Sequence, residues 1–99
     1  MVSIKVVRSQ RDVVAICDSE LIGKKFEEGK LQLDVKESFF RGDEFDDASA
    51  LILLNKMLQE DATFCIVGKK AVELSLEAGV VQEDGIKTVE GIPFSLVLL

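Results

Sequence analysis

The sequence predicts an α+β protein: a single mixed β-sheet with two main helices packed on it, in the order β-β-β-α-β-α-β-β. Residues 2–8 and 31–35 alternate apolar and polar side chains with the period of two that is typical of strands. Residues 47–60 and 69–78 space their apolar side chains with the helical period. The remaining strands are predicted from compact apolar runs bounded by turn residues, at 13–17, 63–67, 86–89 and 94–99.

The composition is that of a single globular domain over residues 1–99. Eighteen acidic and twelve basic residues give a net charge of -6, which argues against a general nucleic-acid-binding protein but allows a local basic patch. The absence of histidine excludes a serine triad and the usual zinc and haem sites, so we predict no metal and no cofactor. No signal peptide is visible and no apolar run approaches the ~20 residues that cross a bilayer, so we expect a cytoplasmic protein with no membrane contact.

The first two predicted strands are separated by four polar residues, 9–12, which predicts a β-hairpin. The run at 13–17 is almost wholly apolar, so its strand should be covered on both faces of the sheet. Asp18 or Ser19 can then cap a short helical turn that stops at Gly23.

The helix predicted at 47–60 follows a cluster of acids, of which Asp46 or Asp47 should cap its first turn. The cluster does not fit a calcium loop, because the glycine and the final glutamate of that pattern are missing. Ile52 and Leu53 widen the apolar stripe beyond a single face, so we expect this helix to be the most buried in the protein.

The first candidate site is Gly68-Lys69-Lys70, between the strand at 63–67 and the helix at 69–78. Glycine lets a ligand approach the backbone, and free N–H groups at a helix start attract anions. Two lysines at this end oppose the helix dipole, which points to an anion or phosphate contact. The alternative is two solvated lysines on an acidic protein. The helix should end at Gly79, which suits a left-handed C-terminal residue.

The second candidate site is the turn Gly23-Lys24-Lys25 together with Asp18 and Glu20. A carboxylate and an ammonium group held in a cleft can do acid–base work if burial shifts their pKa values. The alternative is a capped turn with surface charges.

Cys17 completes this candidate functional turn, Cys17, Asp18 and Glu20, as a possible nucleophile. Without histidine, only lysines or a helix N-terminus could stabilise its thiolate, and the adjacent aspartate opposes ionisation. We therefore expect Cys17 and Cys65 to be reduced, buried thiols.

The segment Phe39-Phe40-Arg41 is the only place that resembles a stacking surface for single-stranded nucleic acid, and it lies beside Asp43 and Glu44. At least one of these two phenylalanines should pack inward, because two adjacent exposed aromatic side chains are unusual.

Five motifs along the chain form a recognisable set: Cys17-Asp18-x-Glu20-Leu21-Ile22-Gly23-Lys24-Lys25-Phe26, Phe39-Phe40-x-Gly42, Val67-Gly68-x-x-Ala71-Val72-Glu73, Glu77-Ala78-Gly79 and Gly91-Ile92-Pro93. Together they resemble a family of small archaeal proteins of unknown function, DUF424. The similarity runs over nearly the whole chain. It implies a single-domain cytoplasmic α/β protein with no established activity, and a link to translation or ribosome assembly. The family pattern often has a histidine after the Gly-x-Pro, where this chain has Phe94.

These observations favour a binding or adaptor protein that contacts RNA phosphate or an acidic, translation-related protein through the two Gly-Lys-Lys turns. The second hypothesis is a small enzyme that uses Asp18, Glu20 and Lys24 near Gly23. The third is a homodimer joined by edge pairing of the last strand, 94–99.

Overall fold

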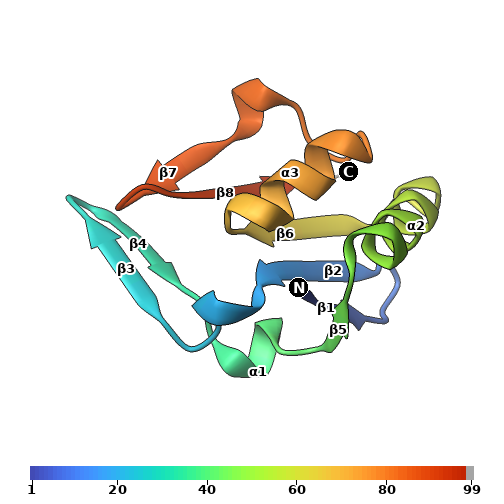
Figure 1. Cartoon of the computed structure of the whole chain (residues 1–99), viewed down its shortest axis with the longest axis horizontal. Helices are drawn as coiled ribbons and strands as arrows, with labels where there is room; N and C mark the ends of the chain where they lie inside the picture. The colour runs from blue at the N-terminus through green and yellow to red at the C-terminus, as the bar shows by residue number, and fades with distance from the viewer. Residues whose placement is uncertain (98–99) are drawn as a thin grey trace.

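A six-stranded mixed sheet lies beside a two-stranded ribbon in the computed structural model, which describes residues 1–97 (Figure 1). The large sheet has the strand order β5-β1-β2-β6-β8-β7. Its strands are β1 (Val2–Val7), β2 (Val13–Asp18), β5 (Asp43–Phe45), β6 (Thr63–Val67), β7 (Lys87–Val89) and β8 (Ile92–Val97). The ribbon pairs β3 (Lys25–Glu28) with β4 (Leu31–Asp34). The helices are α1 (Glu37–Phe40), α2 (Asp47–Gln59) and α3 (Lys69–Glu77), with 3-10 turns η1 (Ser19–Leu21) and η2 (Glu83–Gly85).

The predicted α+β class is confirmed, and β1 and β2 form the predicted antiparallel hairpin. Among the described strands, β2 and β6 are the only parallel neighbours. Parallel strands end at the same edge of a sheet. The end of β2 at Asp18 therefore lies beside the end of β6, where the chain turns at Gly68 into α3.

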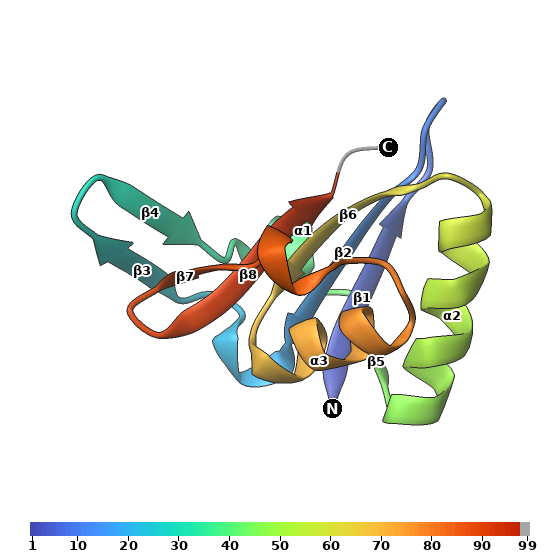
Figure 2. The same ribbon diagram turned by 90° about the horizontal axis from the view of Figure 1, so that it is seen from above.

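Two apolar clusters lie on opposite faces of the sheet. The larger one is enclosed by α2 and α3, and the smaller one by α1 and the β3–β4 ribbon (Figure 2). Strand β2 contributes Val14 and Ile16 to the first cluster and Ala15 and Cys17 to the second. Its apolar run is thus covered on both faces, as predicted.

Three elements were missed because their sequences carry weak or conflicting signals. Strand β3 has one apolar residue, Phe26, among charged neighbours, so no alternating pattern marks it as a strand. Strand β5 lies in the acid cluster interpreted as a helix start, but it pairs with residues 2–4 of β1 at the sheet edge. Charged side chains suit an edge strand because they oppose pairing with other chains. The short helix α1 buries Phe40 and leaves Phe39 half-buried.

The prediction that the helix at 47–60 is the most buried is wrong. Three of the thirteen residues of α2 are buried, and Ile52 is 72% exposed, whereas α3 buries four of nine. Figure 2 shows the reason: α2 lies along the rim of the sheet, next to β1 and β5, while α3 lies across its centre. The predicted cap of α2 is confirmed, because the Oδ1 of Asp46 accepts a hydrogen bond from the N–H of Ser49 at 2.8 Å.

The last strand begins at Ile92, two residues earlier than predicted, and Pro93 lies within it. The prediction for residues 98 and 99 falls outside the described part of the chain. Gly79 has the expected left-handed conformation, with φ 80°, after the end of α3.

Candidate functional site

The carboxylate of Asp18 caps helix α3. Its Oδ1 accepts a hydrogen bond from the N–H of Ala71 at 2.7 Å, and its Oδ2 accepts one from the N–H of Lys70 at 3.1 Å. These N–H groups have no partner within the helix, and a carboxylate at this end also complements the helix dipole. Asp18 therefore caps the helix that begins some fifty residues later in the sequence, rather than the turn that follows it.

Gly68 gives Asp18 the space to do this. Its φ is 109°, a conformation that favours glycine, and a Cβ at this position would lie 2.4 Å from the Cγ of Asp18. The backbone N–H of Gly68 is also engaged, since it donates to the carbonyl oxygen of Pro93 at 2.8 Å. Asp18 and Gly68 thus form one structural unit at the ends of β2 and β6.

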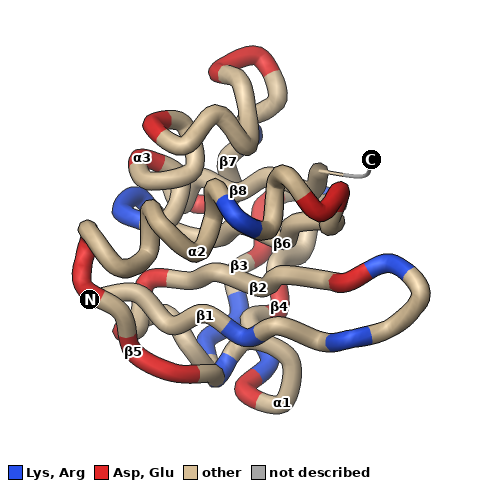
Figure 3. The backbone as a smooth tube through the Cα atoms, turned by 90° about the vertical axis from the view of Figure 1, so that its right-hand side faces the viewer, with Lys and Arg blue, Asp and Glu red and all other residues tan. Residues whose placement is uncertain are grey.

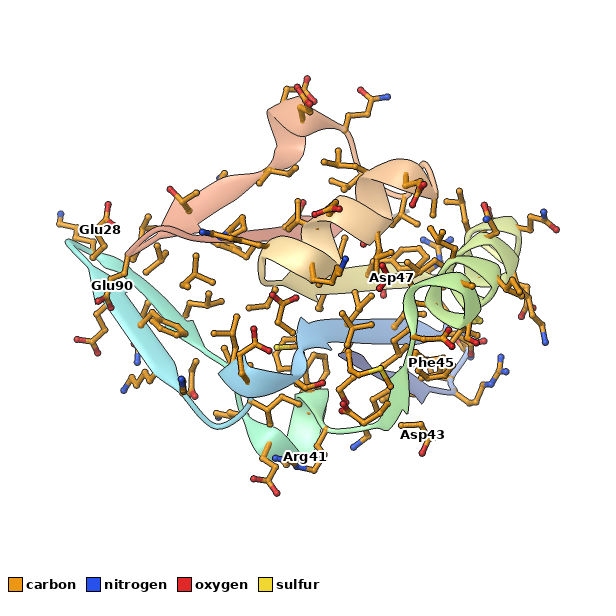
Figure 4. The ribbon with its side chains drawn as sticks, in the orientation of Figure 1. Glu28, Arg41, Asp43, Phe45, Asp47 and Glu90 are labelled. Carbon is orange, nitrogen blue, oxygen red and sulfur yellow. The ribbon has the colours of Figure 1, made fainter. Side chains whose placement is uncertain are left out.

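Asp18 is only 6% exposed, and burial raises the pKa of its carboxyl group, while the two N–H groups at the start of α3 lower it. Two of the N–H groups that an external anion would bind at the first Gly-Lys-Lys turn are thereby already bonded to this carboxylate. The Nζ of Lys70 contacts the Oδ2 of Asp47 at 3.0 Å, and this contact raises the pKa of Lys70. Asp47 lies at the start of α2 (Figure 4). The side chain of Lys69 is exposed.

Cys17 is fully buried, and burial, aided by the charges of Asp18 and Glu20, raises the pKa of its thiol to about 12. The thiol donates a hydrogen bond to the carbonyl oxygen of Asp18 at 3.2 Å. Cys65 is half-buried, and burial raises its pKa as well. Both thiols are free, and at neutral pH Cys17 is protonated, which suits packing rather than nucleophilic chemistry.

The second Gly-Lys-Lys turn is closed by backbone hydrogen bonds. The N–H of Gly23 donates to the carbonyl oxygen of Val35 at 2.7 Å, and the N–H of Val35 donates to the carbonyl oxygen of Lys24 at 2.9 Å. Lys24, Lys25 and Glu20 are exposed. Asp18, by contrast, points into the start of α3, so the structure does not bring these side chains together in one cleft.

A group of basic residues around α1, which we call the basic corner, was not predicted as a unit. The pairing of Val35 with Lys24 places Lys24 next to Lys36 at the start of α1. Lys5 reaches α1 from β1, where its Nζ donates to the carbonyl oxygen of Ser38 at 2.7 Å. The corner comprises Lys5, Lys24, Lys25, Lys36 and Arg41. In the view of Figure 3, several basic segments lie between the labels β1 and α1.

Two acids reduce the charge of this corner. The Nε of Arg41 lies 3.1 Å from Glu37, and the Nζ of Lys25 lies 3.7 Å from Glu27. Lys5, Lys24 and Lys36 take part in no salt bridge within residues 1–97. Phe39, in the same short helix, is half-buried against the smaller apolar cluster and lies edge-on to Phe40, with ring centroids 5.1 Å apart. In the sequence this aromatic pair lies beside Asp43 and Glu44, and only the pairing of distant segments brings Lys5 and Lys24 to this part of the fold.

The β3–β4 ribbon is tied to the turn between β7 and β8. The N–H of Glu90 donates to the carboxylate of Glu28 at 2.8 Å, and the N–H of Glu27 donates to the carboxylate of Glu90 at 2.6 Å. Figure 4 shows Glu28 and Glu90 side by side at the tip of the ribbon. These contacts hold the ribbon against the sheet and so help to fix the position of the basic corner.

The sequence matches the profile of a protein family of unknown function, DUF424, over residues 7–99. The chain belongs to this family. The crystal structure of an uncharacterized conserved protein from Methanopyrus kandleri has the same fold as this DUF424 chain, with a TM-score of 0.81 and 24% sequence identity over 97% of this chain and 89% of that one. No curated protein matches the sequence. Within residues 1–97, no helix is both long and apolar enough to cross a membrane.

Proposed function

We propose that this DUF424 protein is a non-enzymatic binding protein that contacts the phosphates of single-stranded RNA through the basic corner. The observation that carries the proposal is the convergence of lysines from β1, from the turn before β3 and from the start of α1 on one short helix. Lysines that no acid neutralises are the groups that displace counterions from a phosphate backbone.

The distribution of charge along the chain supports this position for the contact. Residues 1–41 contain eight basic and seven acidic residues, whereas residues 42–99 contain four basic and eleven acidic ones. The net charge of -6 therefore belongs to the second part of the chain. A polyanion would be repelled by that part and would approach the basic corner. The half-buried ring of Phe39 offers a surface on which a base can stack.

Lys69 and Lys70 are the second candidate contact for RNA. Lys69 is exposed, but Lys70 already pairs with Asp47, and the carboxylate of Asp18 lies behind both. The local potential is therefore less favourable to an anion here than at α1. The proposal includes a translation-related partner, whose RNA would be the group that the basic corner contacts.

The alternative enzyme, built on Asp18, Glu20 and Lys24, finds less support in this geometry. The Asp18 carboxylate is occupied by two N–H groups, while Glu20 and Lys24 face solvent. A general acid or base must reach the substrate proton, which the bonded Asp18 cannot do without uncapping α3.

The test is fluorescence anisotropy with a labelled oligouridylate of about 12 nucleotides, a length that spans a typical single-strand site. Binding should weaken steeply between about 50 and 200 mM KCl, and Lys24→Glu/Lys36→Glu should abolish most of it and flatten the salt dependence. Lys30→Glu/Lys56→Glu is the matched control, because it makes the same change of charge at exposed residues outside the corner. Equal losses in both variants, or binding that salt does not weaken, would contradict the proposal.

A further inference from the structure

The outer edge of β8 is paired along only part of its length. Strand β7 covers Ile92 to Phe94 and begins at Lys87, which lies opposite Phe94. Beyond this point the chain turns away through η2, and the Oγ of Ser95 donates to the carbonyl oxygen of Gly85 at 2.8 Å. The edge of β8 at residues 95–97 is thus left without a strand beside it among the described residues.

The direction of the main-chain groups on this edge follows from the register. The carbonyl oxygen of Pro93 accepts the N–H of Gly68, so the main-chain groups of Pro93 point toward β6. Because neighbouring residues of a strand alternate in this respect, those of Phe94 and Leu96 point the other way, toward β7. At Leu96, β7 has already ended, and within residues 1–97 no backbone hydrogen bond joins Leu96 to Gly85, the next residue in register.

A pocket of about 360 Å³ lies at this place and is lined by Gly85, Lys87, Phe94, Ser95 and Leu96. Its volume is at the lower end of the range of known ligand pockets, about 300 to 1,000 Å³. Two apolar side chains, Phe94 and Leu96, face the same side of β8. Leu96 is 61% exposed, so its side chain is accessible to a ligand at this edge.

Lys87 supplies a charge at one end of the pocket. It lies directly opposite Phe94, so its side chain is on the same face of the sheet as the two apolar ones. Its side chain is exposed and forms no salt bridge within residues 1–97. The acidic residues of η2, Glu83 and Asp84, do not line the pocket. The pocket therefore combines apolar walls, an open strand edge and one unneutralised ammonium group.

We infer that this pocket binds the C-terminal tail of a partner protein, as an extended strand that ends in an apolar residue with a free α-carboxylate. A ligand strand that pairs antiparallel with residues 95–97 of β8 runs in the same direction as β7. Its last residue therefore lies next to Lys87, the first residue of β7, which blocks any continuation of the ligand chain. The carboxyl end of the ligand is the end that lies there. The carboxylate accepts from the N–H of Leu96 and pairs with the ammonium group of Lys87, while the last side chain packs on Leu96 and Phe94. A parallel strand would place its N-terminal ammonium group against Lys87, which is unfavourable.

The test uses fluorescein-labelled Gly-Ser-Thr-Val-Thr-Leu with a free carboxylate and the same hexapeptide with a C-terminal amide. The free acid should bind the wild-type protein saturably below about 1 mM, and the amide at least about fivefold more weakly, as expected for loss of a partly exposed ion pair. In Lys87→Glu the preference for the acid should disappear, and in Lys87→Arg it should be kept. Lys56→Glu, an exposed lysine on α2, is the control for the change of net charge.

A second measurement reports on the strand edge itself. Addition of the free-acid peptide should slow hydrogen exchange of the Leu96 amide and leave the amide of Ile66, which is inside the sheet, unchanged. Equal binding of acid and amide, no saturable binding, or an unprotected Leu96 amide would overturn the inference. So would sedimentation as a dimer that Leu96→Arg converts to a monomer, because a second copy would then occupy the edge. None of these outcomes bears on the RNA proposal, which concerns residues around α1.

Discussion

The Asp18 carboxylate occupies the space in which a Cβ at residue 68 would lie, 2.4 Å from the Asp18 Cγ. The two residues are fifty positions apart in the sequence and meet because β2 and β6 run parallel and end at one edge. This contact accounts for the glycine before α3 without any external ligand. It also explains why a carboxylate follows the apolar run of β2.

Gly68→Ala should destabilise the protein by about 3 kcal/mol, because the new Cβ meets the Asp18 carboxylate and the backbone φ is unfavourable for alanine. The control is Gly79→Ala, where φ is also positive but no atom lies within 4 Å of the added Cβ. That variant should lose only about 1 kcal/mol. Urea unfolding of both variants checks the prediction, and equal losses would show that the clash with Asp18 is unimportant.

Asp18→Ala should lower the free energy of unfolding by about 2 kcal/mol, because two N–H groups at the start of α3 lose their acceptor. Amide hydrogen exchange of Lys70 and Ala71 should accelerate in this variant more than exchange of the amides in the middle of β6. A uniform acceleration throughout the protein would instead indicate a general loss of packing.

The pH dependence of Asp18 should have an unusual sign. Its pKa in the folded protein is raised above 3.8 by burial, so the folded state holds the proton more tightly than the unfolded state. The stability that Asp18 contributes is then fully present at low pH and falls as the pH rises through the folded pKa. The free energy of unfolding of wild type minus that of Asp18→Asn should therefore decrease from below pH 3.8 toward neutral pH.

The pH dependence of the stability that Asp46 contributes should have the opposite sign. The N–H of Ser49 lowers the pKa of its carboxyl group, so its contribution is present above 3.8 and is lost as the pH falls through the folded pKa. The free energy of unfolding of wild type minus that of Asp46→Asn should therefore decrease toward low pH. Two difference curves that slope the same way would contradict the assigned environments.

Cys17 should resist alkylation in the folded protein. Its thiol is buried and has a pKa of about 12, so almost no thiolate exists at about pH 8. Iodoacetamide treatment followed by mass spectrometry should modify Cys17 only after denaturation, with half-buried Cys65 reacting earlier. Rapid modification of Cys17 in the native protein would instead support the hypothesis that its thiol is a nucleophile.

The regular elements with clean periodicity could be predicted from the sequence. Strands β1, β2 and β6 and helices α2 and α3 each carry a single pattern, and the cap at Asp46 follows from its position before an apolar helix. Strand β5 could not be predicted, because Asp43 and Glu44 are poor strand formers and are held in place by pairing with β1. The exposure of Ile52 also depends on where α2 lies on the sheet, which periodicity does not reveal.

The residues of the candidate site could be predicted from the sequence, but the contacts between them could not. The sequence singles out Asp18 and Gly68 separately, and only the parallel pairing of β2 with β6 shows that one caps the helix that the other begins. The basic corner depends in the same way on long-range contacts, since Lys5 and Ser38 are far apart in sequence and joined only in the fold. Local patterns contain no information on such pairs.

The most direct test of the RNA proposal is a map of amide chemical shifts of the isotope-labelled protein during titration with the oligouridylate. We predict that the shifts concentrate at Lys24, Lys36, Phe39 and Arg41, and that raising the salt concentration reverses them. Shifts centred on Lys69 and Lys70, or no saturable shifts around α1, would contradict the assignment of RNA binding to the basic corner.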